Sequence, residues 1–312
     1  MKNYVYDLET YQNLFCGVFN GEGDETVFEI SARKNQYKEL IEFYTPENIK
    51  FAIGFNCQRF DSQVMQYLVD NYSKFRFKQG SELCRLIYEF VQEIIRRSDA
   101  KEFLPYPEWK ITVRQIDLFL ILHYSNQARL TSLKWLEFSI DYDKVQDLPY
   151  KFDRPLHSST FDEVIEYCKN DVKATRMFAE QCIDIIKLRI SQDKQFPDLR
   201  LLNKPDSSVG ETLFLHYMSE SMGIDKKELK TKRTHRAPLY AKDILLPYIN
   251  FKTPEFQSVL DWYKESITNG LKKSVHFGGI DFEFGEGGIH ASCENRIFEA
   301  DDEYEILDID VK

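Results

Sequence analysis

Three short apolar segments, separated by turn residues, occupy the first thirty residues and restrict the fold more than any other feature. They have the length and the aromatic and β-branched content of strands, and they are Asn3 to Glu9, Leu14 to Asn20 and Glu25 to Ile30. The cluster Asn20-Gly21-Glu22-Gly23 supplies a turn between the last two. These short connections predict a meander, so the chain is expected to begin with a sheet on which later segments pack.

Helical and strand patterns alternate after the meander. The segments with apolar residues at helical spacing are Asn35 to Tyr44, Asp61 to Val69, Ser81 to Arg97 and Thr131 to Phe138. Lys50 to Phe55 is an apolar strand, and Lys110 to Leu122 alternates before becoming apolar, which predicts a strand entering a core. Thr160-Phe-Asp-Glu163 matches a capping box and opens a long helix whose apolar stripe reaches Ile186. This order predicts an α/β fold, a mixed sheet with flanking helices.

A length of 312 residues suits two domains, and one segment has the composition of a linker between them. Residues 191–208 are polar and contain Pro197 and Pro205. We therefore expect a first domain over residues 1–190 and a second over residues 209–312. The second domain begins with a helix near Gly210 to Met222 and ends in a glycine-rich segment.

The N-terminus lacks the apolar region of a signal peptide, and no apolar run is long enough to span a bilayer. The six cysteines form no Cys-x-x-Cys pair and no zinc-ligand spacing, which is typical of reduced thiols in the cytosol. The sequence therefore predicts a soluble cytoplasmic protein without a membrane partner.

A formal charge of −10 excludes a protein that coats nucleic acid by overall charge alone. Any such binding has to use local patches, and the densest basic run is Lys226, Lys227, Lys230, Lys232, Arg233, His235 and Arg236. A run of this kind is usually a solvated surface, and a contact with a DNA backbone is the alternative. Aromatic residues make up 14% of the chain, and this composition fits either a phenylalanine-rich core or base stacking.

Five residues with carboxylate or phenol groups form a candidate site. Asp7 and Glu9 are two apart on the first predicted strand, so both point to one face of the sheet. Asp61 opens a predicted helix, where an aspartate is usually only a cap. Tyr167 and Asp171 are four apart on the long predicted helix and share one face, where a buried tyrosine is the simpler interpretation.

Four carboxylates brought together repel one another and need a counter-ion. Hard oxygen ligands favour Mg²⁺ or Mn²⁺. Two such ions about 3.5–4 Å apart form a template for in-line displacement at phosphorus, in which one ion activates a water molecule and the other stabilises the leaving oxygen. The residues therefore predict a two-metal phosphodiesterase site, with the Tyr167 hydroxyl orienting the water.

The three segments that carry these residues resemble the exonuclease motifs of the DEDDy group of 3′→5′ exonucleases. They are Asp7-Leu-Glu9, Asn56-x-x-x-Phe60-Asp61 and Tyr167-x-x-x-Asp171. The resemblance covers roughly residues 1 to 190 and implies a ribonuclease H-like fold. It also implies that Asp7 bridges two Mg²⁺ or Mn²⁺ ions, that Glu9 and Asp171 complete one metal site, and that Asp61 serves the other.

The same resemblance implies residues that contact the substrate. Thr10, Asn56 and Phe60 are expected to contact the 3′-terminal nucleotides, and Lys134 lies where some phage relatives have a phosphate-contacting lysine. The basic run at Lys226 to Arg236 is then expected to contact the DNA backbone.

The end of the sequence resembles phage family B DNA polymerases. Gly285-Glu-Gly-Gly-Ile-His290, with Gly287 and Gly288, is similar to the glycine-rich segment between their exonuclease and polymerase domains, although a turn-rich hairpin explains it equally well. Tyr304-Glu-Ile-Leu-Asp-Ile-Asp-Val-Lys312 is similar to the start of polymerase motif A, which implies a metal ligand at Asp310. Motifs B and C are absent, so we expect an incomplete polymerase palm and a second polypeptide that supplies them.

The expected function is therefore proofreading 3′→5′ hydrolysis of single-stranded or primer-template DNA, as the N-terminal part of a split or intein-interrupted family B polymerase in the host cytoplasm. A free-standing 3′→5′ exoribonuclease is one alternative. A DNA-binding subunit that completes a two-chain polymerase without cleaving DNA is another.

Overall fold

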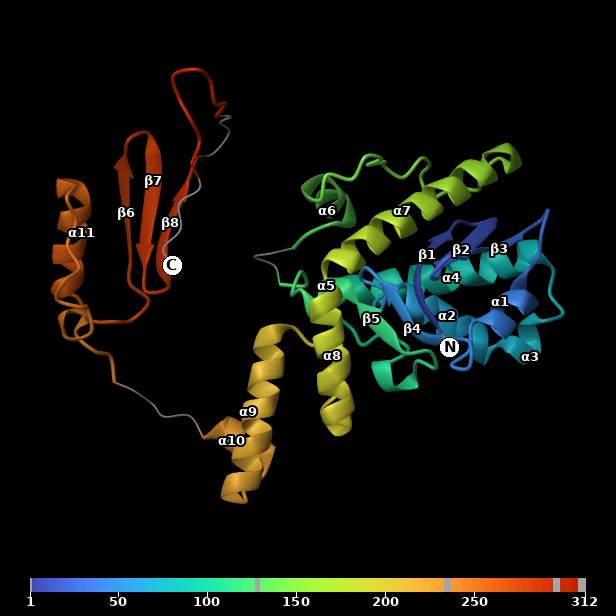
Figure 1. Ribbon diagram of the computed structural model, residues 1–312, viewed down its shortest axis with the longest axis horizontal. Helices are drawn as coiled ribbons and strands as arrows, with labels where there is room; N and C mark the ends of the chain where they lie inside the picture. The colour runs from blue at the N-terminus through green and yellow to red at the C-terminus, as the bar shows by residue number, and fades with distance from the viewer. Residues whose placement is uncertain (1, 127–129, 233–236, 294–297, 308–312) are drawn as a thin grey trace. The chain divides into compact units, whose positions relative to one another are not determined.

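The computed structural model describes residues 2–126, 130–232, 237–293 and 298–307, and the chain divides into two compact units (Figure 1). The first unit comprises residues 1–229 and the second residues 230–312. Across the described residues, no helix is both long and apolar enough to cross a membrane.

A five-stranded mixed sheet forms the centre of the first unit. Its strands are β1 (Lys2–Thr10), β2 (Leu14–Asn20), β3 (Glu25–Ser31), β4 (Ile49–Gly54) and β5 (Gln115–Asp117), in the spatial order β3-β2-β1-β4-β5. The meander β1-β2-β3 is antiparallel, whereas β4 and β5 are parallel to β1. The predicted α/β class, with its N-terminal meander and mixed sheet, is confirmed.

Helices cover both faces of this sheet (Figure 1). The helices described over residues 37–231 are α1 (Tyr37–Phe43), α2 (Asp61–Asp70), α3 (Tyr72–Phe75), α4 (Gly80–Asp99), α5 (Leu118–Ile121), α6 (Leu133–Ser139), α7 (Phe161–Gln181), α8 (Ile183–Gln195), α9 (Asp206–Met222) and α10 (Lys226–Thr231). Short 3₁₀ turns are found at Glu108–Lys110, Ser158–Thr160 and Pro197–Leu199.

The alternation of side chains along β1 divides the core into two layers. Tyr4, Tyr6 and Leu8 point to the face covered by α1, α2 and α4. Val5 points to the opposite face, which α7 covers. Asp7 and Glu9 share the parity of Val5, so β1 presents both carboxylates towards α7.

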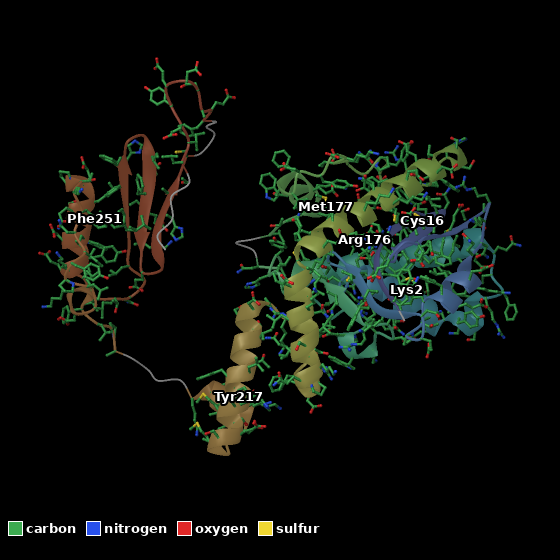
Figure 2. The ribbon with its side chains drawn as sticks, viewed as in Figure 1. Lys2, Cys16, Arg176, Met177, Tyr217 and Phe251 are labelled. Carbon is green, nitrogen blue, oxygen red and sulfur yellow. The ribbon has the colours of Figure 1, made fainter. Side chains whose placement is uncertain are left out.

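Helix α7 is held against the edge of the meander by polar contacts as well as by its apolar stripe. Arg176, labelled in Figure 2, donates a hydrogen bond from Nη1 to the carbonyl oxygen of Gly21 at 2.6 Å. Cys16 of β2, also labelled there, belongs to the same buried cluster as Cys168 of α7. These contacts position α7 on the sheet.

The prediction of a long strand over Lys110 to Leu122 is wrong. Only Gln115–Asp117 is a strand, and the apolar residues that follow form α5. The Asp117 side chain accepts a hydrogen bond from the Phe119 backbone N–H at 3.0 Å, and this cap turns the chain from strand to helix. An apolar run this short has no periodicity that separates a strand from a buried helical turn.

The predicted capping box and the single long helix also differ from the structure. Thr160 has φ −99° and ψ −1°, and its Oγ1 donates to the carbonyl oxygen of His157 at 2.8 Å, so the threonine caps no N–H of α7. The apolar stripe continues to Ile186, but the helix breaks at Cys182 into α7 and α8.

The segment predicted as a linker, residues 191–208, packs on the first unit. Leu201 and Leu202 are buried. The Asn203 side chain accepts a hydrogen bond from the Asp117 N–H at 2.8 Å and donates one to the Gln115 carbonyl at 2.9 Å. The division between compact units falls later in the chain, after Leu229.

The second unit contains a three-stranded antiparallel sheet and one longer helix. Its elements are the 3₁₀ turn Ala241–Asp243, α11 (Pro254–Lys264), β6 (Lys272–Phe277), β7 (Ile280–Gly285) and β8 (Gly288–Ser292). Phe256 of α11 packs edge-on against Phe282 and Phe284 of β7. Gly287 and Gly288 belong to the β7–β8 turn, where Gly288 has φ +145°. Asp310, Arg233, His235 and Arg236 lie outside the described residues.

Candidate metal centre

Three carboxylates from two elements meet at the β1–α7 interface. Asp7 and Glu9 come from β1 and Asp171 from α7. Each offers one oxygen, and the three oxygens lie within 4.8 Å of one another. This spacing allows a single cation to contact all three groups, and oxygen donors of this kind suit Mg²⁺ or Mn²⁺.

Asp61 supplies a fourth carboxylate from the first residue of α2. It is buried, and its Oδ1 has no hydrogen-bond partner among the described residues. A buried carboxylate oxygen left without a donor is costly unless a cation or water contacts it. Apart from burial, the Asp61 charge is the strongest influence that raises the pKa of Asp7, so the two groups are neighbours electrostatically.

The four carboxylates hold protons more tightly than isolated ones. Burial raises the pKa of Glu9 to about 8, and repulsion from Asp171 and Asp61 adds to this effect. Burial likewise raises the pKa of Asp61 to about 8. The pKa of Asp7 is raised well above its ordinary value by burial and by Asp61, Glu9 and Asp171. A divalent cation would relieve this repulsion, so the donor set and the unpartnered Asp61 oxygen both fit a metal ion.

Lys134 of α6 brings a positive charge to this cluster. Its Nζ donates to Asp171 Oδ1 at 2.6 Å and to Glu137 Oε1 at 3.2 Å. The same Nζ lies 4.7 Å from the centre of the Tyr167 ring. Lys134 was expected to contact phosphate, and here it lies against a carboxylate of the centre.

Glu137 is a fifth acidic residue near the centre that sequence reasoning missed. It is fully buried, and its Oε2 has no partner among the described side chains and backbone groups. Its spacing of three residues from Lys134 on a helix was the available signal. Burial raises its pKa, while Lys134 opposes that effect.

Tyr167 lies one helical turn before Asp171 and is buried. Burial raises its pKa, and the charges of Asp171 and Glu9 raise it further. A hydrogen bond from Tyr167 in turn lowers the pKa of Asp171, although burial, the largest influence on Asp171, raises it. The hydroxyl therefore stays protonated at neutral pH and acts as a donor beside the carboxylates.

The turn before α2 is fixed by Asp117, a second residue that sequence reasoning missed. Its carboxylate accepts hydrogen bonds from the Asn56 N–H and the Gln58 N–H, each at 2.9 Å. Asn56 has φ +59°, a left-handed conformation that asparagine tolerates better than most residues. Burial raises the pKa of Asp117 to about 6. Asp117 thereby sets where α2, and with it Asp61, begins.

The other residues expected to contact a nucleic-acid substrate lie in both units of the chain. Thr10 is buried at the end of β1, directly after Glu9. Phe60 precedes α2 and packs partly against the aromatic layer of the core. Gly287 and Gly288 belong to the second unit.

No protein-family model, curated protein or solved structure matches this chain.

Proposed function

We propose that this chain is a metal-dependent 3′→5′ exonuclease that acts on single-stranded or primer-template DNA, and that it forms the N-terminal part of a family B DNA polymerase. The observation that carries the proposal is the convergence of Asp7, Glu9 and Asp171 within 4.8 Å, with the buried Asp61 beside them. The strand order β3-β2-β1-β4-β5, with Asp7 and Glu9 on the central strand, is compatible with a ribonuclease H-like fold.

The chemistry requires a phosphodiester, a water molecule and a means of carrying negative charge. Two bound Mg²⁺ or Mn²⁺ ions would lower the pKa of the attacking water and stabilise the leaving 3′ oxygen. Asp7 would hold the ions together with Glu9 and Asp171, whose oxygens lie within 4.8 Å of its own, and with Asp61, whose charge raises the pKa of Asp7. Lys134 offsets part of the negative charge of the cluster through its ion pair with Asp171.

Tyr167 has a positioning role in this proposal. Its hydroxyl remains protonated at neutral pH because burial and the neighbouring carboxylates raise its pKa. It therefore orients a water molecule or a phosphate oxygen by donating a hydrogen bond, and does not remove a proton.

The test is incubation of the full chain with 5′-labelled single-stranded DNA and Mg²⁺ or Mn²⁺, with a chelator lane and a matched RNA strand. We expect a ladder that shortens from the 3′ end and that disappears with chelator and in the double variant Asp7→Ala, Glu9→Ala. Asp153→Asn, an exposed aspartate on a loop, serves as the control and retains activity.

Absence of cleavage by the folded, metal-loaded chain would overturn the proposal for this polypeptide. Faster cleavage of RNA than of DNA would instead favour the exoribonuclease alternative. Cleavage that is unaffected by the Asp7→Ala, Glu9→Ala change would locate the activity elsewhere.

A further inference from the structure

Two large aromatic side chains stand exposed on α6. Trp135 is 62% exposed and Phe138 is 68% exposed. Their ring centres are 5.8 Å apart and their planes differ by 27°, so the two rings form one stacked surface. Exposed aromatic surface of this size has an unfavourable contact with water and commonly marks a binding site.

The rest of α6 is anchored, so the two rings are held in a fixed place. The Ser132 hydroxyl accepts a hydrogen bond from the Trp135 N–H at 3.2 Å and caps the helix. Leu136 and Glu137 are buried against the first unit. The cap and the buried residues fix the helix, and Trp135 and Phe138 lie on its exposed surface.

The stacked pair lies on the same short helix as Lys134, which contacts the carboxylate cluster. Phe138 follows Lys134 by one helical turn, and Lys134 Nζ lies 2.6 Å from Asp171 Oδ1. A polymer whose terminal phosphodiester reaches Asp171 therefore passes the neighbourhood of this helix.

We propose that Trp135 and Phe138 form a stacking surface for the bases of a single-stranded nucleic acid whose 3′ end enters the carboxylate cluster; this inference rests on the function proposed above. The overall charge of the chain gives no attraction for a nucleic acid, so the affinity has to come from another interaction. The chain has a formal charge of −10, so attraction to a polyanion cannot come from its overall charge. Stacking on aromatic rings supplies affinity that is independent of charge and tolerant of sequence.

The experiment uses the full chain and oligonucleotides that carry a single 2-aminopurine at the first, second, third or fourth position from the 3′ end. Ca²⁺ replaces Mg²⁺ because it takes the same oxygen ligands, and intact DNA is checked on a gel. We expect quenching of 2-aminopurine at one or two adjacent positions, as stacking on the rings produces.

The double variant Trp135→Ala, Phe138→Ala is expected to lose this quenching and to weaken Kd by about 5- to 150-fold for each base that stacks. The matched control is Trp109→Ala, Phe77→Ala, because these residues are 66% and 76% exposed on other parts of the first unit. Trp135→Phe, Phe138→Tyr keeps both rings and should restore quenching, which separates stacking from a folding defect.

Hydrolysis of thymidine 5′-p-nitrophenyl phosphate by the wild-type chain reports on the carboxylate cluster separately. Hydrolysis together with unchanged oligonucleotide binding in the Trp135→Ala, Phe138→Ala variant would overturn the stacking surface and leave the proposed nuclease intact. Binding that depends on the two rings without hydrolysis would support the surface and count against the nuclease. A wild-type chain that shows no position-dependent quenching also overturns the inference, and points to a protein occupant of this face.

Discussion

Replacing Glu9 by glutamine should stabilise the metal-free protein and weaken its response to metal. The pKa of Glu9 is raised from its ordinary value of 4.5 to about 8, chiefly by burial. The folded state therefore binds the proton more tightly than the unfolded state, and stability is lost as the pH rises from about 4.5 to about 8.

The size of this effect follows from the same pKa values. Because the unfolded state ionises Glu9 more readily than the folded state, the metal-free protein loses on the order of 1 kcal/mol of stability by pH 5 and on the order of 4 kcal/mol by pH 8. The neutral glutamine avoids this cost. Because Asp61, Asp7 and Asp171 respond to the loss of one neighbouring charge, we expect a net gain of about 2–4 kcal/mol at pH 8 and less than about 1 kcal/mol at pH 5.

Urea unfolding in the presence of a chelator measures this difference, and repetition with Mg²⁺ measures the metal response. Glu9→Gln should have the higher midpoint in chelator at pH 8 and the smaller increase on addition of Mg²⁺, because one metal ligand is lost. Glu39→Gln, an exposed glutamate of α1, is the control and should change neither. A variant that is less stable than the wild type at pH 8 in chelator would refute the prediction that the buried Glu9 carboxylate destabilises the metal-free folded state.

Three further predictions concern residues around the cluster. Lys134→Met should raise the pKa of Asp171 and move the acid limb of the pH–rate profile upward, since Lys134 lowers that pKa. Asp117→Asn should destabilise the protein by about 1–3 kcal/mol in thermal unfolding, since one of the two oxygens that accept from the Asn56, Gln58 and Phe119 N–H groups is replaced by an NH2 donor. Tyr167→Phe should lower kcat by about 10²-fold with Mn²⁺ affinity unchanged in calorimetric titration, since it removes a positioning donor and no ligand.

Each of these three has an outcome that contradicts it. An unshifted pH–rate profile for Lys134→Met would show that the ion pair with Asp171 does not affect the titration of the active cluster. An Asp117→Asn protein as stable as the wild type would mean that the turn before α2 is fixed by other contacts. Loss of Mn²⁺ binding in Tyr167→Phe would assign the hydroxyl to the metal site.

The sequence predicted the sheet and the carboxylates on β1 because strand alternation is a local property. Asp7 and Glu9 share the parity of Val5, and that parity directs all three to the α7 face. A spacing of four placed Tyr167 and Asp171 on one face of a helix for the same reason. These expectations needed only the geometry of one element at a time.

What sequence reasoning missed depends on contacts between distant segments. Asp117 accepts two hydrogen bonds from residues about 60 positions earlier in the chain, and nothing near it in sequence indicates that it fixes the turn before α2. Glu137 is linked to the cluster through Lys134, which contacts both Glu137 and Asp171, 37 residues away from that lysine. The break between α7 and α8 was hidden because the apolar stripe continues through it.

The hydrogen bonds of Asn203 limit how far the chain can be shortened from its C-terminal end without disturbing the carboxylate cluster. Its side chain satisfies the Asp117 N–H and the Gln115 carbonyl, and Asp117 in turn holds the turn that leads to Asp61. A fragment that ends at residue 190 would keep every carboxylate of the cluster but would lose the hydrogen bonds that Asn203 makes with Asp117 and Gln115 of β5. A fragment that keeps the carboxylate cluster in its place should therefore extend past Asn203, well beyond Asp171, the last carboxylate of the cluster in the sequence.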